Sequence, residues 1–123
     1  MYKHLFFDLD NTLWDFRANA HEAFHDIFTE LGLFSRIPDF PKFLAVYEQC
    51  NELLWSEYRK GKVKKDVMRI ERMQLTFSEM GVDDPELAKH VGEIYLLRAP
   101  KKTNVFPDVH ETLEYLAGRY QLH

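Results

Sequence analysis

Hydrophobic residues at the start of the chain form a short continuous run that ends abruptly in polar residues. The run extends from Tyr2 to Leu9, is rich in aromatic side chains, and leads into a polar cluster from Asp8 to Thr12. A continuous apolar run of this length, bounded by turn-forming residues, is typical of a buried strand in a parallel sheet. We therefore predict one buried strand followed by a loop.

From about Asp15 the hydrophobic positions recur every three or four residues, which is the period of an amphipathic helix. The first helix is expected to end at Gly32, because glycine readily adopts the left-handed conformation that closes helices. The same periodicity predicts two further helices, which end near Gly61 and Gly81. Asp84 offers an N-cap for a fourth helix.

The last part of the chain predicts a connector, a short helix and the beginning of a second strand. Residues 100–107 lack periodicity, Asp108 is expected to cap a helix that stops near Gly118, and Tyr120 to His123 are typical of a strand. Two parallel strands joined by the intervening helices would form a βαβ unit of an α/β fold. Because two strands make a poor sheet for such a fold, we expect these residues to be the N-terminal part of a longer chain.

Composition and charge narrow the range of functions. The 123 residues are 46% hydrophobic and 29% charged, as in ordinary globular proteins, and the net charge of −4 argues against a general nucleic-acid binder. No segment approaches the roughly 20 consecutive apolar residues that span a bilayer, so no membrane partner is expected. Cys50 is the only cysteine. A cytoplasmic location is therefore expected, since no disulfide can form within one chain.

Two carboxylates follow the first predicted strand. Asp8 and Asp10 lie two positions apart, so an extended backbone directs both side chains to the same side. Ligands of open α/β sheets bind at this end of the strands, and Mg²⁺, which prefers carboxylate, water and phosphate oxygens, would offset the repulsion between the two acids. Asn11 and Thr12 add an amide and a hydroxyl. The alternative is an acidic turn without a ligand, because all these residue types favour turns.

The segment from Leu5 to Leu13, with its Asp-x-Asp-x-Thr sequence after an apolar strand, resembles the first motif of the haloacid dehalogenase superfamily of phosphohydrolases. This resemblance implies a Rossmann-like α/β core, represented by residues 1–14 and 100–123. It also implies that residues 15–99 form an inserted four-helix cap. The aromatic-rich lead and the residues that follow the motif, Leu13 to Phe16, are most similar to the pyrimidine 5′-nucleotidase branch of the superfamily.

The resemblance also implies roles for the residues of the motif. Asp8 would be the nucleophile that forms an aspartyl-phosphate, and Asp10 would be the general acid and base. Both aspartates would hold the cofactor Mg²⁺, while Asn11 and Thr12 would bind the substrate phosphate. An acid at position 10 favours phosphate-ester hydrolysis, because the dehalogenases and phosphonatases of the superfamily lack it. The expected substrate is a small phosphorylated metabolite, with a nucleoside 5′-monophosphate as one candidate.

Members of the superfamily use further groups that do not occur in order within residues 1–123. These groups are a Ser or Thr after the next strand, a Lys, and an acidic pair that completes the Mg²⁺ site. Lys101 and Lys102 come too early in the chain to supply the lysine. We therefore expect residues 1–123 alone to be inactive, with the missing part of the core or a pairing chain completing the site. Closure of the cap would use hinges near residues 14–15 and 99–107.

Three other interpretations compete with this one. The segment from His21 to His25 matches HExxH, in which two histidines one helical turn apart bind zinc and Glu22 acts as the base. The simpler interpretation is that both histidines flank the apolar stripe of a helix. The basic run from Arg59 to Lys65 could meet an anionic ligand, although a solvated connection between helices explains it as well. A non-enzymatic helical interaction module is the third alternative.

Overall fold

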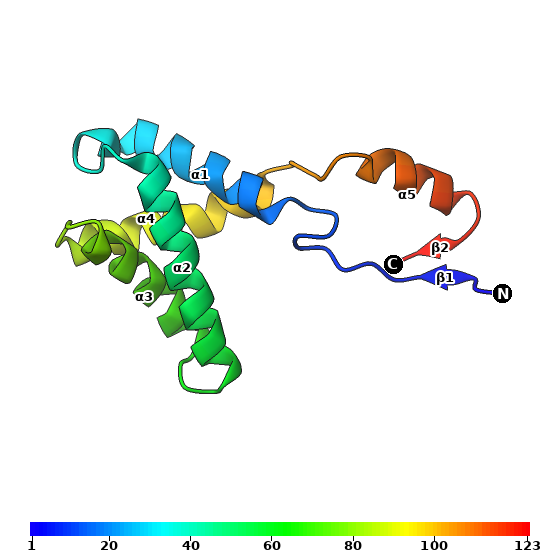
Figure 1. The fold of residues 1–123 in the computed structure, drawn as a ribbon, viewed down its shortest axis with the longest axis horizontal. Coiled ribbons are helices and arrows are strands. Elements are labelled where there is room, and N and C mark those ends of the chain that lie inside the picture. The colour runs from blue at the N-terminus through cyan, green and yellow to red at the C-terminus, as the bar shows by residue number, and fades with distance from the viewer.

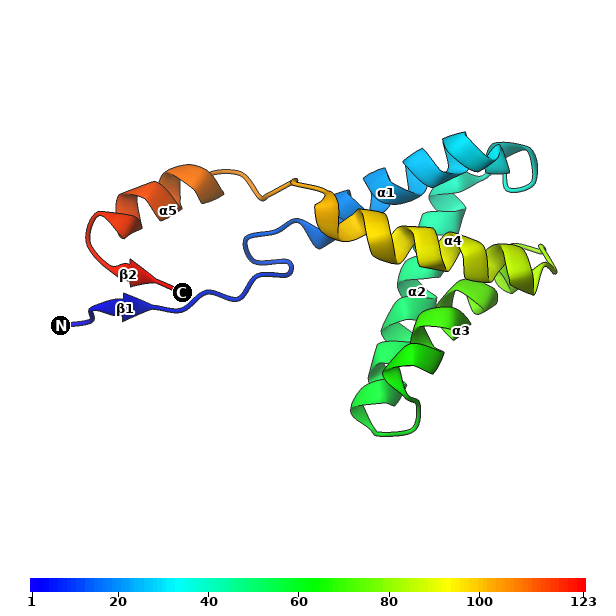
Figure 2. The same cartoon turned by 180° about the vertical axis from the view of Figure 1, so that it is seen from behind.

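The computed structural model describes residues 1–123, which form two groups of elements joined by two passages of chain (Figure 1). Along the chain the elements are β1 (His4–Leu5), α1 (Phe16–Leu31), the 3₁₀ helix η1 (Leu33–Ser35), α2 (Phe40–Arg59), α3 (Lys65–Glu79), α4 (Pro85–Arg98), the 3₁₀ helix η2 (Ala99–Lys101), α5 (Val109–Ala117) and β2 (Gln121–Leu122). The view from behind in Figure 2 shows the same separation of α1–α4 from the strands and α5. None of the helices is both long enough and apolar enough to cross a bilayer.

Helices α1 to α4 form a bundle with an aromatic core, which we call the helical bundle. Helix α3 packs between α2 and α4, and α1 packs on α4. Phe24 of α1 is fully buried, with its ring centroid 4.6 Å from that of Tyr47 and 4.4 Å from that of Tyr95. Burying a ring of this size stabilises the fold by about 2 to 3 kcal/mol relative to leaving it in water. The apolar stripes of four helices therefore meet in one core.

The ends of these helices follow the residues that the sequence indicated. The side chains of Asp15 and Asp84 accept hydrogen bonds from backbone N–H groups in the first turns of α1 and α4, at 3.0 and 3.1 Å. Gly32 ends α1 with φ of 64°, a left-handed conformation that suits glycine. Asp108 behaves differently from the prediction. It precedes α5, but its own φ is 63° and its side chain makes no capping hydrogen bond.

The two strands form a parallel pair, as a βαβ connection requires. His4 lies opposite Gln121 and Leu5 opposite Leu122. The ladder continues beyond the pair, because Phe7 N donates to His123 O at 2.8 Å. The predicted second strand and its parallel direction are therefore confirmed.

The prediction of a long buried first strand is wrong in two respects. The strand itself comprises only His4–Leu5, with ladder hydrogen bonds reaching from Lys3 to Phe7, whereas the apolar run starts at Tyr2 and ends at Leu9. The side chains of Phe6 and Leu9 are 79% and 58% exposed. The physical reason is that a strand is buried by its neighbours, and within residues 1–123 only β2 pairs with β1.

Candidate active site

The polar segment after β1 folds into a tight turn. The carbonyl oxygen of Leu9 accepts hydrogen bonds from the backbone N–H groups of Thr12, Leu13 and Trp14, at 3.3, 3.0 and 2.9 Å. Asn11 N donates to Trp14 O at 2.9 Å, and Asn11 has a φ of 59°, which asparagine tolerates better than most residues. The turn therefore fixes the backbone from Leu9 to Trp14.

The two aspartates of the turn are exposed and carry no basic partner. Thr12 Oγ1 donates to Asp8 Oδ2 at 2.9 Å, and neither Asp8 nor Asp10 takes part in an ion pair. The structure thus brings Thr12 against Asp8, as one orienting contact, and leaves the side chain of Asn11 exposed without a partner. Two carboxylates without a cation are the hard oxygen donors that Mg²⁺ prefers, and one or two protein carboxylates suffice for it. The residues present therefore fit the protein's share of such a site, although no third His, Cys, Asp or Glu joins them.

A cleft of about 450 Å³ lies where the turn meets the helical bundle, and we call it the interdomain cleft. Asp10 is its acidic lining residue. Its aromatic and cationic lining residues are Trp14, Phe16, Trp55, Lys65, Arg69, Arg72 and Tyr95. The sequence interpretation missed the residues that the bundle contributes, because Trp55 and the basic residues of α3 recur at ordinary helical spacing and look like core or solvated positions.

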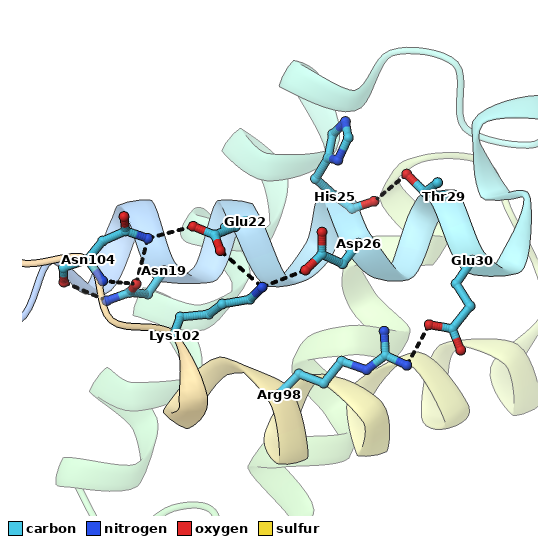
Figure 3. A network of polar contacts seen from close by, with 9 residues as sticks. All are labelled: Asn19, Glu22, His25, Asp26, Thr29, Glu30, Arg98, Lys102 and Asn104. Carbon is cyan, nitrogen blue, oxygen red and sulfur yellow. Dashed lines mark hydrogen bonds and ion pairs between the residues drawn. The ribbon is translucent and has the colours of Figure 1, made fainter.

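Two passages of chain connect the bundle to the strands, and hydrogen bonds join them side by side. Asp15 N donates to Asn104 O and Trp14 Nε1 donates to Lys102 O, both at 3.0 Å. Asn19, which is fully buried, donates from Nδ2 to Asn104 O and accepts from Asn104 N, each at 2.9 Å. Figure 3 shows this pairing at the start of α1. The two passages therefore form one braced unit, which we call the linker clamp.

Charged residues extend the linker clamp along α1. Lys102 lies between Glu22 and Asp26, with Nζ 3.0 Å from Glu22 Oε1 (Figure 3). Hydrogen bonds from Asn104 and then Lys102 lower the pKa of Glu22. The hydrogen bonds of Lys102 with Asp26 and Glu22 raise the pKa of its ammonium group. Both groups are therefore held in their charged forms at neutral pH.

The same geometry accounts for the HExxH segment. His21 Nε2 lies 2.8 Å from Glu48 Oε1, and Glu22 turns instead toward the linker clamp. The ring of His25 packs edge-on against Phe34, with centroids 5.6 Å apart. The three residues engage different partners, and no group of three potential metal ligands exists around them. The structure therefore favours the interpretation of an ordinary helix face over that of a zinc hydrolase.

The basic run after α2 is a connection between two helices, as expected from its composition. Arg59 ends α2 and Lys65 begins α3. Lys60 and Lys62 both pair with Glu57, at 3.2 and 3.4 Å, so part of the positive charge of the run is offset within it. Lys65 differs from the others because it lines the interdomain cleft.

Comparison with known proteins decides the family. The family model of the haloacid dehalogenase-like hydrolases matches residues 2–122. The chain belongs to this family. Membership confirms the resemblance of the Leu5–Leu13 segment and favours an enzyme over a non-enzymatic interaction module. Proteins with this description are hydrolases as a class.

Two relatives of this haloacid dehalogenase-like chain define how much of the fold it covers. Pyrimidine 5′-nucleotidase PynA from Streptococcus pneumoniae is 27% identical over 118 residues, which are 96% of this chain and 47% of that protein. A Bacillus subtilis protein named as a HAD hydrolase, YfnB, was crystallised with magnesium and superimposes with a TM-score of 0.84 at 22% identity. That match covers 98% of this chain and 50% of YfnB. The chain therefore spans about half the length of its relatives and has a partial α/β core with an inserted set of helices.

Proposed function

We propose that this haloacid dehalogenase-like protein hydrolyses phosphate monoesters, with Asp8 as nucleophile, Asp10 as general acid and base, and Mg²⁺ as cofactor. One observation carries the proposal. Two aspartates without basic partners lie at the start of a tight turn after β1, and one of them, Asp10, lines the interdomain cleft. This arrangement provides a nucleophile and a proton-transfer group side by side in sequence, next to a space that can hold the rest of a substrate.

Asp8 is suited to attack on phosphorus. Its Oδ2 accepts the hydrogen bond from Thr12, so Oδ1 remains as the oxygen that forms the new bond. Attack by a carboxylate displaces the alcohol and leaves an aspartyl-phosphate, which water then hydrolyses, so that one difficult reaction becomes two easier ones. In the second displacement the bond from Asp8 to phosphorus breaks, and the carboxylate is regenerated.

Asp10 is suited to move the protons of both displacements. Asp10 lines the interdomain cleft, where the departing alcohol would lie. In the first displacement Asp10 gives a proton to the leaving oxygen, and in the second it takes one from the attacking water. Bound Mg²⁺ would neutralise charge between carboxylate and phosphate, and the side chain of Asp8 with the backbone carbonyl of Asp10 would hold it. Asn11 and Thr12 are proposed to contact the phosphate from the turn.

We further propose that residues 15–99 act as a cap over a core formed by residues 1–14 and 100–123. The linker clamp lies between these parts, so the cap would move as a unit and exclude water when it closes. A nucleoside 5′-monophosphate is the proposed substrate, supported by the name of the relative PynA. A reducing location such as the cytoplasm suits a chain whose only cysteine is the free Cys50.

The decisive experiment uses Asp8→Asn in the full-length gene product, assayed with Mg²⁺ and a panel of phosphate monoesters. Loss of the nucleophile is expected to lower kcat by at least about 10³-fold. Asp83→Asn is the matched control, because Asp83 is exposed beside α4, away from the turn. Unchanged turnover by Asp8→Asn would refute the proposed role. Residues 1–123 alone are expected to show no turnover, because no third acid joins the two aspartates to complete a metal site.

A further inference from the structure

Arg72 of α3 is a buried cation in the wall of the interdomain cleft. It is only 5% exposed. Its Nη1 donates to Asn51 Oδ1 at 2.9 Å, while its Nε has no hydrogen-bond partner. No carboxylate lies within ion-pair distance of the guanidinium. A buried guanidinium with one neutral hydrogen bond is an incomplete arrangement for a side chain with five donors.

The other arginines of the chain show that this arrangement is unusual. Four of them pair with a carboxylate: Arg17, Arg36, Arg69 and Arg98. The remaining two, Arg59 and Arg119, are exposed to solvent. Arg72 is therefore the one arginine that is removed from water without a counter-ion.

The aromatic neighbours of Arg72 do not supply the missing charge. Its Cζ lies 5.8 Å from the ring centre of Tyr47 and 5.6 Å from that of Tyr95, distances at which a cation is attracted to a ring face. Burial raises the pKa of both tyrosine hydroxyls, so both remain neutral phenols. The rings thus hold the guanidinium in place. Its Nε is enclosed by the protein, whereas Nη2 makes no hydrogen bond and is not fully buried, so Nη2 is the donor that can meet an acceptor in the cleft.

The position of the cleft indicates which part of a substrate would meet Arg72. Asp10, the proposed general acid and base, lines the cleft, whereas Asp8 does not. The transferred phosphate would therefore lie at the mouth of the cleft, and the leaving group inside it. Trp14 and Trp55 line the same space, and indole rings are good stacking surfaces for flat heterocycles. A volume of about 450 Å³ is within the usual range for small-molecule sites.

We propose that Arg72 is a specificity-determining residue that donates a hydrogen bond to a carbonyl oxygen on the base of a nucleotide substrate. The inference rests on the proposed function, because it concerns the leaving group of the same reaction. The base stacks against the tryptophan-lined wall, and its exocyclic carbonyl gives Arg72 the acceptor that the protein lacks. Arg72 touches the substrate but takes no part in proton transfer or attack.

The kinetic test compares two substrates in the full-length gene product. Uridine 5′-monophosphate carries the carbonyl-bearing base, and ribose 5-phosphate presents the same phosphoryl sugar without it. Arg72→Met is expected to lower kcat/KM for the nucleotide by about 10- to 100-fold, the loss of a charge-assisted hydrogen bond, and to change that for ribose 5-phosphate by less than about threefold. Arg36→Met is the control, since Arg36 pairs with Asp84 outside the cleft.

Two outcomes of this test would overturn the inference. An equal fall in kcat/KM for both substrates would show that Arg72 only supports the bundle. An unchanged kcat/KM for the nucleotide would show that Arg72 does not contact the substrate. Arg72→Lys guards against misfolding, because it keeps the charge over the tyrosine rings and loses the planar donors. Arg72→Lys is expected to lower nucleotide turnover selectively while its melting temperature stays close to that of the wild type.

A binding measurement separates this inference from the proposed function. The chain has two tryptophans, Trp14 and Trp55, and both line the cleft, so uridine should quench their fluorescence whether or not hydrolysis occurs. Arg72→Met is expected to weaken uridine binding about tenfold or more, with ribose as the non-binding reference. Failure of the wild type to hydrolyse any phosphate ester would refute the proposed function alone. Absence of uridine binding, or binding unaffected by Arg72→Met, would refute the role of Arg72.

Discussion

The helical bundle and the strand-and-turn segment are stabilised to very different extents by their own residues. In the bundle Phe24, Phe28 and Phe43 are completely buried. In the strand-and-turn segment Phe6 is 79% exposed, and Val109 is the only buried residue outside residues 19–99. The bundle thus closes its own core, whereas the segment that carries Asp8 and Asp10 depends on neighbours for rigidity. In this chain the residues proposed to react with the substrate lie in the less packed region. Arg72, the residue proposed to select the substrate, lies in the better packed one.

The largest expected effect contrasts one phenylalanine from each region. Phe24→Ala should destabilise the bundle by about 3 to 5 kcal/mol, because it leaves a cavity among Phe43, Tyr47 and Tyr95. Phe6→Ala should change stability by less than about 1 kcal/mol, since its ring is mostly in water already. Urea unfolding of residues 1–123, followed by circular dichroism at 222 nm, measures both. Similar effects at the two sites would contradict the contrast between the regions.

A smaller effect is expected at the linker clamp, where the two regions join. Asn19→Ala removes three hydrogen bonds to Asn104 and leaves the backbone N–H of Asn104 without its acceptor, while Asn104 O keeps the bond from Asp15 N. The free energy of unfolding should fall by about 1 to 3 kcal/mol. Hydrogen exchange should show faster exchange at Asp15 and Asn104, whose amides bond within the linker clamp. Ser35→Ala, at the exposed last position of η1, is the control. Unaltered exchange in Asn19→Ala would show that the two passages are not coupled.

The smallest effect is a pH dependence of the same linker clamp. The pKa of Glu22 is lowered in the folded chain. Its contribution to the free energy of unfolding is therefore present above the ordinary pKa of a glutamate, and it is lost as the pH falls through the lowered pKa. The pKa of Lys102 is raised in the folded chain. Its contribution to the free energy of unfolding is therefore lost only at high pH, as the pH rises through the raised pKa. The difference in melting temperature between wild type and Lys102→Met should therefore be larger at pH 7 than at pH 3. A difference that grows on acidification would contradict the assignment.

Sequence reasoning succeeded where local rules decide the structure. Helical periodicity and Gly32 at the end of α1 predicted the bundle, because stripes and caps act within one element. Sequence reasoning failed for the burial of Phe6, because burial depends on partners that are distant in sequence. It also failed for the capping by Asp108, because the left-handed backbone at position 108 carries the side chain away from a capping geometry. Local rules also give no warning that a charged helix position such as Arg72 will be buried.

The candidate site divides in the same way. Asp8, Asp10, Asn11 and Thr12 could be proposed from the sequence because they lie together in one motif. The contact of Thr12 with Asp8 follows from the turn that this motif forms. The bundle's part of the interdomain cleft could not be found, because its residues come from separate helices and the spacing of Lys65, Arg69 and Arg72 within α3 is that of any solvated helix face. Only their packing against the turn brings them to one place.

The central claim is that Asp8 becomes covalently attached to phosphorus during turnover. It is tested most directly by mixing the full-length gene product with Mg²⁺ and a phosphate monoester, quenching in acid, and reducing the acyl phosphate with borohydride. Reduction turns a phosphorylated aspartate into an alcohol that peptide mass spectrometry locates. The account predicts this change at Asp8 and at no other residue, and its absence in Asp8→Asn. Turnover without a reducible adduct, or an adduct at another carboxylate such as Asp10, would contradict the account.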